Sequence, residues 1–132
     1  MESNSGSPVR SRRAGDIAVI YASDYLNKLS GERIERECRM HLLEGCRALV
    51  VDFRNTGLVN SIGVSILLGV IDAAERADAR LVFCRVNDQA AQLFELLGLT
   101  KYVTLVEDEA AAINHLSEFN LKASAMAGRA EL

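Results

Sequence analysis

The chain has 132 residues, of which 49% are hydrophobic and 25% are charged, and its formal net charge at pH 7 is −3. That length and balance fit one globular domain with a single core. The chain lacks the basic patch that nucleic-acid binding needs, and no apolar run approaches the roughly 18 to 20 residues of a membrane span, so neither nucleic-acid binding nor membrane insertion is expected.

The three cysteines and the polar first residues indicate a protein of the reducing cytoplasm. Cys38, Cys46 and Cys84 are odd in number and lack the Cys-x-x-Cys spacing of disulfide frameworks and zinc sites. Residues 1–8 are polar, unlike a secretion signal. We expect the thiols to fill core space, with Cys46 as the one exception, because it follows Gly45 in a turn.

The two ends of the chain are expected to lie outside the domain. Residues 1–13 are rich in Ser, Gly and Arg and have little apolar surface to bury, which predicts a disordered tail. The basic cluster of this tail consists of Arg10, Arg12 and Arg13. We interpret the cluster as solvated, and a docking arm is the alternative. The domain is predicted to span residues 14–118, and residues 119–132 are expected to end the last helix and continue as a flexible tail.

The first elements in chain order are a strand and an amphipathic helix. Residues 17–21 form a short run rich in β-branched side chains, which predicts a strand. The next apolar pair, Tyr25 and Leu26, either continues the sheet edge or begins a loop. The helix is expected to start at Ser30 as its N-cap and to stop at Gly45. Its apolar face repeats at three- and four-residue steps and comprises Ile34, Cys38, His41 and Leu42. Its polar face carries Arg33, Arg36, Glu37 and Arg39.

The remaining elements alternate between strands and helices. The expected order is strand 48–53, loop 54–60, helix 61–77, strand 81–86, helix 88–97, strand 103–106 and helix 107–120. The inward faces of the two middle helices are predicted to carry Val64, Leu67, Leu68 and Ile71, and then Ala91, Phe94 and Leu97. This alternation indicates an α/β fold with a mainly parallel sheet, mixed at the edge, of four to five strands and about four helices.

The motifs of nucleotide-binding and catalytic sites are absent from the sequence. There is no Gly-x-Gly-x-x-Gly turn, no phosphate-binding loop and no Gly-x-Ser-x-Gly elbow. A triad can be assembled on paper from Ser61, His41 or His115, and Asp52, but no motif supports it. No cluster has the spacing of metal ligands. We therefore expect neither a cofactor nor enzymatic activity, and an enzyme or nucleotide binder on this sheet remains the alternative from another class.

The segment from Asn60 to Gly63 lies where the loop after the central strand enters a helix. Ser61 then lies at or beside the N-cap, where simple capping explains a serine. The second interpretation is a modification site, because a phosphate there would face free backbone N–H groups and the positive end of the helix dipole.

The stretch from Val50 to Leu116 resembles the STAS domain, the module of anti-sigma-factor antagonists. Residues 50–53 match the family's central strand, and Ser61 and Gly63 match its phosphorylated serine and the glycine that follows. Leu67, Leu68 and Gly69 match the helix, and residues 93–99 match the third helix and its turn. Upstream, Leu26, Asn27 and Ser30 look like the family's first loop and helix start. The resemblance covers about residues 15–118.

The chain departs from the family pattern at four positions. Asn60 and Asn27 stand where the family usually has Asp, Ile62 replaces a second hydroxyl residue and Ser65 replaces a glycine. Asn60 keeps the ability to cap but removes a negative charge beside Ser61, which bears on the kinase that recognises it. Ser65, one turn further on, is a candidate second acceptor.

The resemblance implies a phosphorylation-controlled binding protein. The unphosphorylated module would bind an anti-sigma factor that carries a GHKL-type serine kinase domain, phosphorylation of Ser61 would release it, and a PP2C-type phosphatase would reverse the change. The partner surface is expected to comprise Asn27, Ser30, Asn60, Ser61, Ile62, Gly63, Val64 and Ser65. The alternative is a STAS scaffold that is never phosphorylated, in a stressosome-like complex or a lipid-transport assembly. A homodimer is left open.

Overall fold

A five-stranded sheet forms the middle layer of the structure, a computed structural model that describes residues 9–118. The strand order is β1-β2-β4-β6-β7, with β1 antiparallel to β2 and every other neighbouring pair parallel. The strands are β1 (Ser11–Ala14), β2 (Ile17–Tyr21), β4 (Ala48–Asp52), β6 (Arg80–Cys84) and β7 (Thr104–Val106). A separate two-stranded sheet pairs β3 (Tyr25–Leu26) with β5 (Leu58–Val59) in parallel.

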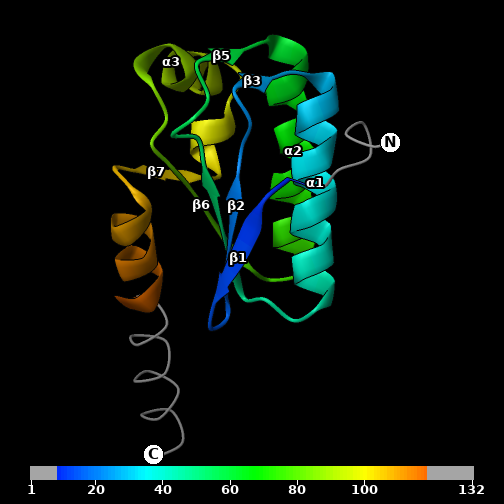
Figure 1. Ribbon diagram of the computed structural model, residues 1–132, viewed down its shortest axis with the longest axis vertical. Coiled ribbons are helices and arrows are strands. Elements are labelled where there is room, and N and C mark those ends of the chain that lie inside the picture. The colour runs from blue at the N-terminus through cyan, green and yellow to red at the C-terminus, as the bar shows by residue number, and fades with distance from the viewer. Residues whose placement is uncertain (1–8, 119–132) are drawn as a thin grey trace, which may run out of the picture.

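Helices cover both faces of the sheet, as Figure 1 shows. The helices α1 (Lys28–Leu43) and α2 (Ser61–Arg76) lie side by side on one face, and α3 (Asp88–Leu96) lies beyond the carboxyl ends of the strands. The opposite face is covered by the C-terminal helix, residues 109–118. The described residues therefore confirm the predicted α/β fold with a mainly parallel sheet of five strands and about four helices. No helix within residues 9–118 is both long and apolar enough to span a membrane.

The sheet has a separate apolar core on each face because its strands are buried on both sides. The larger core joins alternate residues of β2, β4 and β6 to α1, α2 and α3, and its centre is a cluster of three edge-to-face rings. Phe53, Phe83 and Phe94 have ring centroids 5.1 to 5.6 Å apart. The smaller core joins the other strand residues to Ala112 and Leu116 of the C-terminal helix.

The expected start of the first helix is wrong by three residues. Asn27, not Ser30, is the N-cap of α1, and its side chain accepts a hydrogen bond from the Ser30 N–H at 3.0 Å. In turn, the Ser30 hydroxyl accepts a hydrogen bond from the Asn27 N–H at 2.9 Å. This reciprocal capping box explains why two residues with good N-cap chemistry stand three positions apart.

Residues 11–14 correct the expected tail, because they form β1 instead of lying in solvent. The strand is short and has no apolar run, so its sequence does not resemble a strand. Side chains further along the chain hold it in place: the Ser11 hydroxyl donates to Glu37 at 2.6 Å and Arg13 pairs with Glu44 at 3.0 Å. Residues 1–8 and 119–132 of the expected tails lie outside the described residues.

Contacts with β1 also correct the predicted polar face of α1. Glu37 and His41 are only 8% and 6% exposed, whereas Glu37 was expected on the solvent side. His41 contacts the Ser11 hydroxyl through Nε2 at 2.9 Å and accepts from Arg13 Nε through Nδ1 at 3.1 Å. These polar groups are buried together because each finds a partner across the β1–α1 boundary.

Three apolar positions also differ from expectation. Cys46 is buried at 5% exposure, because the chain turns back under α1 after Gly45. Leu68 and Leu97 were expected to face inward but are 41% and 36% exposed. The buried stripe of α2 is centred on Leu67 and Val70, and a residue one position away is rotated by about 100° from that stripe.

The C-terminal helix begins two residues later than predicted. Asp108 caps it by accepting the Ala111 N–H at 2.8 Å, and Glu109 is its first helical residue. The predicted end at residue 120 lies outside the described residues.

Candidate functional site

The candidate site lies where α2 begins, at the carboxyl end of the sheet. Asn60 is the N-cap, and its Oδ1 accepts a hydrogen bond from the Gly63 N–H at 2.8 Å. Ser61 is therefore the first helical residue and is not itself the cap. Its side chain is exposed, and its hydroxyl has no hydrogen-bond partner within residues 9–118. A free hydroxyl at a helix N-terminus faces the positive end of the helix dipole.

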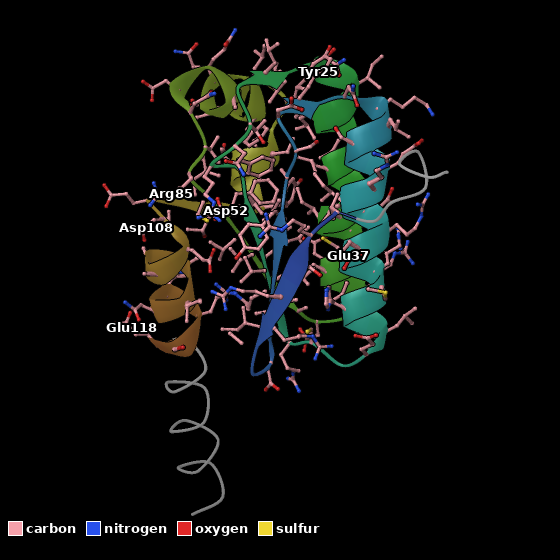
Figure 2. All side chains as sticks on the ribbon, in the orientation of Figure 1. Tyr25, Glu37, Asp52, Arg85, Asp108 and Glu118 are labelled. Atoms are coloured by element: carbon pink, nitrogen blue, oxygen red, sulfur yellow. The ribbon has the colours of Figure 1, made fainter. Side chains whose placement is uncertain are left out.

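The Asn60 side chain also ties the start of α2 to β3. Its Nδ2 donates to the Tyr25 hydroxyl at 3.1 Å, and its backbone N–H donates to the Leu26 carbonyl at 2.9 Å. Figure 2 shows Tyr25 at the end of the molecule where both long helices begin. The amide is well suited to this position because its oxygen caps the helix while its nitrogen serves as a donor.

Close backbone packing sets the position of the first turn of α2. A Cβ on Gly63 would lie 2.7 Å from the Leu26 carbonyl oxygen and 2.8 Å from the Asn27 nitrogen. A Cβ on Gly31 would lie 3.2 Å from the Gly63 carbonyl oxygen. The starts of α1 and α2 and the end of β3 thus meet at two glycines, which fixes the direction in which Ser61 faces.

Hydrogen bonds between loops hold the segment that leads to Ser61. The Thr56 hydroxyl donates to the Ser23 carbonyl at 2.5 Å, and Thr56 is only 6% exposed. Asn87, the N-cap of α3, donates from Nδ2 to the Thr56 carbonyl at 3.2 Å. The loops after β2, β4 and β6 are therefore joined through Thr56, a role that its position in a seven-residue loop did not reveal.

An exposed apolar rim surrounds the start of α2. We define it as five residues whose side chains are between 41% and 79% exposed: Tyr25, Leu29, Leu58, Ile62 and Leu96. A shallow groove beside it is lined by Val59, Gln89, Gln92, Leu93 and Leu96. The first charged residue of α2 is Asp72, so the surface around Ser61 on this helix is uncharged. Exposed apolar patches with polar neighbours are typical of protein interaction sites.

The eight predicted partner-contact residues divide by burial. Ser61, Ile62 and Ser65 are exposed, and Asn27 and Asn60 are half-buried. The three buried residues are Ser30, Gly63 and Val64, with Ser30 at 8% and Val64 at 0% exposure. In this conformation these three support the site from within and do not offer side chains to a partner. Of the rim, only Ile62 was among the predicted residues.

Two of the residues considered above for a catalytic triad, His41 and Asp52, have other surroundings. His41 bonds to Ser11 and Arg13 of β1, and Asp52 is 1% exposed on the face of the sheet that the C-terminal helix covers. No group of three or more metal-ligating side chains occurs among the described residues. Burial raises the pKa of Cys84 to about 12, with the carboxylates of Asp52 and Glu109 adding to the effect.

The chain matches a known protein family, and its fold is similar to several solved structures. The family model described as the STAS domain matches residues 9–112. Among solved structures, the anti-sigma factor antagonist SpoIIAA in its unphosphorylated form has a TM-score of 0.71 and 18% identity, over 83% of this chain and 96% of that one. The phosphorylated form of Bacillus SpoIIAA has a TM-score of 0.65 and 18% identity, over 82% and 98%.

A third solved structure is an anti-sigma factor antagonist from Mycobacterium paratuberculosis. Its TM-score is 0.71 and its identity 15%, over 87% of this chain and 97% of that one. At such identities the likeness concerns the fold.

Proposed function

The chain belongs to the STAS domain family, and from this premise we propose that it is an anti-sigma-factor antagonist that works by binding and not by catalysis. Its unphosphorylated form binds an anti-sigma factor with a GHKL-type serine kinase domain. Phosphorylation of Ser61 ends the binding, and a PP2C-type phosphatase restores it. The ATP and Mg²⁺ of the reaction belong to the kinase, and the exchange takes place in the cytoplasm.

The observation that carries the proposal is the free, exposed hydroxyl of Ser61 at the first position of α2. A kinase reaches it without unfolding the chain, since the cap is supplied by Asn60 and no internal hydrogen bond must break. The backbone N–H groups of the first turn and the helix dipole then stabilise the phosphate.

The apolar rim explains how a phosphate ends the binding. A partner that covers Tyr25, Leu58 and Ile62 removes water from the space around Ser61. A phosphate adds about −1.5 to −2 charges there, and burying that charge without a partner is costly. The chain itself need not change shape, in keeping with the similar match to SpoIIAA in its unphosphorylated and phosphorylated forms.

Asn60 distinguishes this chain from relatives with an acidic residue beside the serine. Asn60 accepts from the Gly63 N–H and donates to the Tyr25 hydroxyl, whereas an Asp there would accept from both, so the cap geometry is compatible with either residue. The difference is the charge that a kinase meets next to its target. We infer that the cognate kinase reads an uncharged surface here.

The test is phosphorylation of the purified chain by the GHKL-type kinase encoded nearest to it, with ATP and Mg²⁺, followed by intact mass. One added phosphate is expected on the wild type and on Ser65→Ala, the matched control one turn away, and none on Ser61→Ala. The phosphorylated chain and Ser61→Asp are expected to lose binding to the kinase, and a PP2C-type phosphatase is expected to restore it.

Two results contradict the proposal. If Ser61→Ala is still phosphorylated while Ser65→Ala is not, the acceptor is a residue other than Ser61. No phosphate at all, with the kinase active on its own control substrate, would favour the scaffold in a stressosome-like or lipid-transport assembly.

A further inference from the structure

A second cluster of ionisable groups lies away from Ser61, where the start of the C-terminal helix meets the sheet. Its centre is a pair of carboxyl groups, Asp52 at the end of β4 and Glu109 at the first turn of the helix. Asp52 lies beside Tyr21 in the register of β4 and β2, and the Tyr21 hydroxyl donates to Glu109, which brings the two carboxyl groups to the same edge of the sheet. In the view of Figure 2, Asp52 lies at the height at which the C-terminal helix begins. None of these groups takes part in the proposed function.

Asp52 is buried with half of its carboxyl group unpaired. Its exposure is 1%, and its Oδ1 accepts the Arg54 N–H at 2.9 Å. Its Oδ2 has no hydrogen-bond partner among the described residues. A buried carboxylate with a lone oxygen is costly, whereas a protonated carboxyl turns that oxygen into a donor. Burial raises the pKa of Asp52, the Arg54 N–H opposes the change, and the neighbouring Glu109 raises the pKa further.

Glu109 is the natural acceptor of that proton because it is held as a carboxylate. Arg12 donates to its Oε1, and the Tyr21 hydroxyl donates to its Oε2 at 3.0 Å. Burial alone would raise the pKa of Glu109, but the hydrogen bonds from Arg12 and Tyr21, with a smaller contribution from Asp52, outweigh it and lower that pKa. Two neighbouring carboxyl groups whose surroundings drive them in opposite directions are the arrangement in which one is protonated and the other ionised.

The pair sits at the boundary between the C-terminal helix and the sheet. The C-terminal helix covers this face of the sheet in the described structure, and its apolar contacts come from Ala112, Ile113 and Leu116. Glu109 adds a polar contact that reaches two strands at once, through Arg12 of β1 and Tyr21 of β2. The protonation state of Asp52 therefore bears directly on the first turn of the helix.

We propose that Asp52 and Glu109 share one proton across this boundary, and that loss of the proton as pH rises loosens the C-terminal helix from the sheet. With the proton present, neutral Asp52 lies beside ionised Glu109. Without it, the buried carboxylate of Asp52 lies beside the half-buried carboxylate of Glu109, and the two repel. We call this pH-dependent contact of Asp52 with Glu109, between the sheet and the C-terminal helix, the latch. It is separate from the phosphorylation site.

The direction of the pH effect follows from the two shifts. The pKa of Asp52 is raised in the folded chain, so the stability that it contributes is present below its ordinary value of 3.8 and is lost as pH rises through the folded value. The pKa of Glu109 is lowered, so its contribution is present above the ordinary 4.5 and is lost as pH falls through the folded value. Above pH 4.5, therefore, the pair responds to pH through Asp52.

Other charged or ionisable groups face the pair from each neighbouring element. They are Arg12 on β1, Tyr21 on β2, Arg54 after β4, Cys84 and Arg85 at the end of β6, and Asp108 before the helix. Hydrogen bonds to Glu109 and Tyr21 raise the pKa of Arg12, so it stays charged at every pH of the test, and the raised pKa of Cys84, about 12, keeps the thiol neutral. Tyr21 donates a hydrogen bond to Glu109. His115 of the same helix buries its Nε2 without a hydrogen-bond partner among the described residues, so the variant Asp52→Asn, which keeps His115, separates the response of Asp52 from that of the histidine.

The test follows the side-chain carboxyl carbons of Asp52 and Glu109 by NMR on the full chain, together with hydrogen-exchange protection of residues 112–116 from pH 4 to 8. Protection factors are corrected for the intrinsic pH dependence of exchange. We expect Asp52 to titrate above the ordinary aspartate range and Glu109 below the glutamate range. Protection of the helix amides is expected to fall with rising pH by up to about tenfold per unit until Asp52 has lost its proton.

Variants separate the latch from general stability. Asp52→Asn keeps a neutral donor beside Glu109, so the helix should stay protected and its pH dependence above 4.5 should vanish. Glu109→Gln removes the acceptor, so Asp52 should titrate at lower pH than in the wild type. Glu107→Gln makes the same charge change at an exposed residue two positions away and should alter neither titration.

Two outcomes overturn the proposal. In the wild type, an Asp52 titration at or below the ordinary aspartate range would show that no proton is shared. Helix protection that changes with pH equally in the wild type and in Asp52→Asn would assign the pH response to another group. The wild-type titration decides the first point even if a variant fails to fold.

Discussion

Substitution of Gly63 by Ala tests whether close backbone packing positions the start of α2. The added Cβ would lie 2.7 Å from the Leu26 carbonyl oxygen and 2.8 Å from both the Leu26 carbonyl carbon and the Asn27 nitrogen. These are backbone atoms, so no side chain can rotate away and β3 or α2 must shift. Overpacking of this kind typically costs about 1 to 3 kcal/mol.

Gly69→Ala in the same helix is the matched control. Its Cβ would meet Oε2 at the end of the Glu35 side chain, and that flexible carboxylate can move. Glu35 pairs with Arg39 at 2.9 Å, an exposed ion pair whose loss costs about 0.3 to 0.5 kcal/mol. Both variants gain up to about 1 kcal/mol of helix propensity, so this gain largely cancels in the comparison.

The assay is urea unfolding followed by far-UV circular dichroism on the wild type and both variants. We expect Gly63→Ala to be less stable than Gly69→Ala by about 1 to 3 kcal/mol. Equal stability of the two variants would refute the reasoning, because it would mean that the contact between β3 and α2 relaxes without cost.

Three further predictions concern the cap, the ring cluster and the thiols. Asn60→Ala removes the bond to the Gly63 N–H and should lower the free energy of unfolding by about 0.5 to 2 kcal/mol, whereas an unchanged urea midpoint would show that the cap adds no stability. Phe94→Ala removes one ring of the three-ring cluster and should cost about 3 to 5 kcal/mol in the same assay; a loss below about 1 kcal/mol would contradict tight packing there. Burial raises the pKa of both Cys38 and Cys84, so neither thiol should react with Ellman's reagent in the folded chain at pH 8, and rapid labelling of either before unfolding would speak against the buried positions.

Much of the fold could be predicted because its strands and helices are defined by local apolar patterns. The strand at residues 17–21 has the predicted bounds, and the strand predicted at 48–53 ends one residue earlier. The start of α2 was also readable, since an Asn-Ser step before an apolar helical stripe is an N-terminal signal. The position of Ser61 therefore followed from local sequence together with the family resemblance.

What the sequence did not predict depends on polar contacts between distant residues. Glu37 looks like a surface residue of α1 until β1 lies over it and Ser11 donates to it. The β3–β5 pair has only two residues in each strand, too few for any periodic pattern. The sequence also did not predict that Leu58 and Leu96 are exposed. An apolar residue is expected to be buried, and only the tertiary structure shows otherwise.

The long reach of β1 has a consequence for how the chain folds during synthesis. Arg12 and Glu109, which join β1 to the C-terminal helix, are 97 positions apart. At about 5 to 20 residues per second, the ribosome needs on the order of 5 to 20 s to make that interval, so β1 waits that long for its helical partner. Contacts of such high sequence separation form late, and one face of the sheet stays uncovered in the nascent chain until the helix emerges. The helical cover therefore closes after the sheet beneath it has formed, and the growing chain is most open to chaperones and to aggregation just before residues 109–118 emerge.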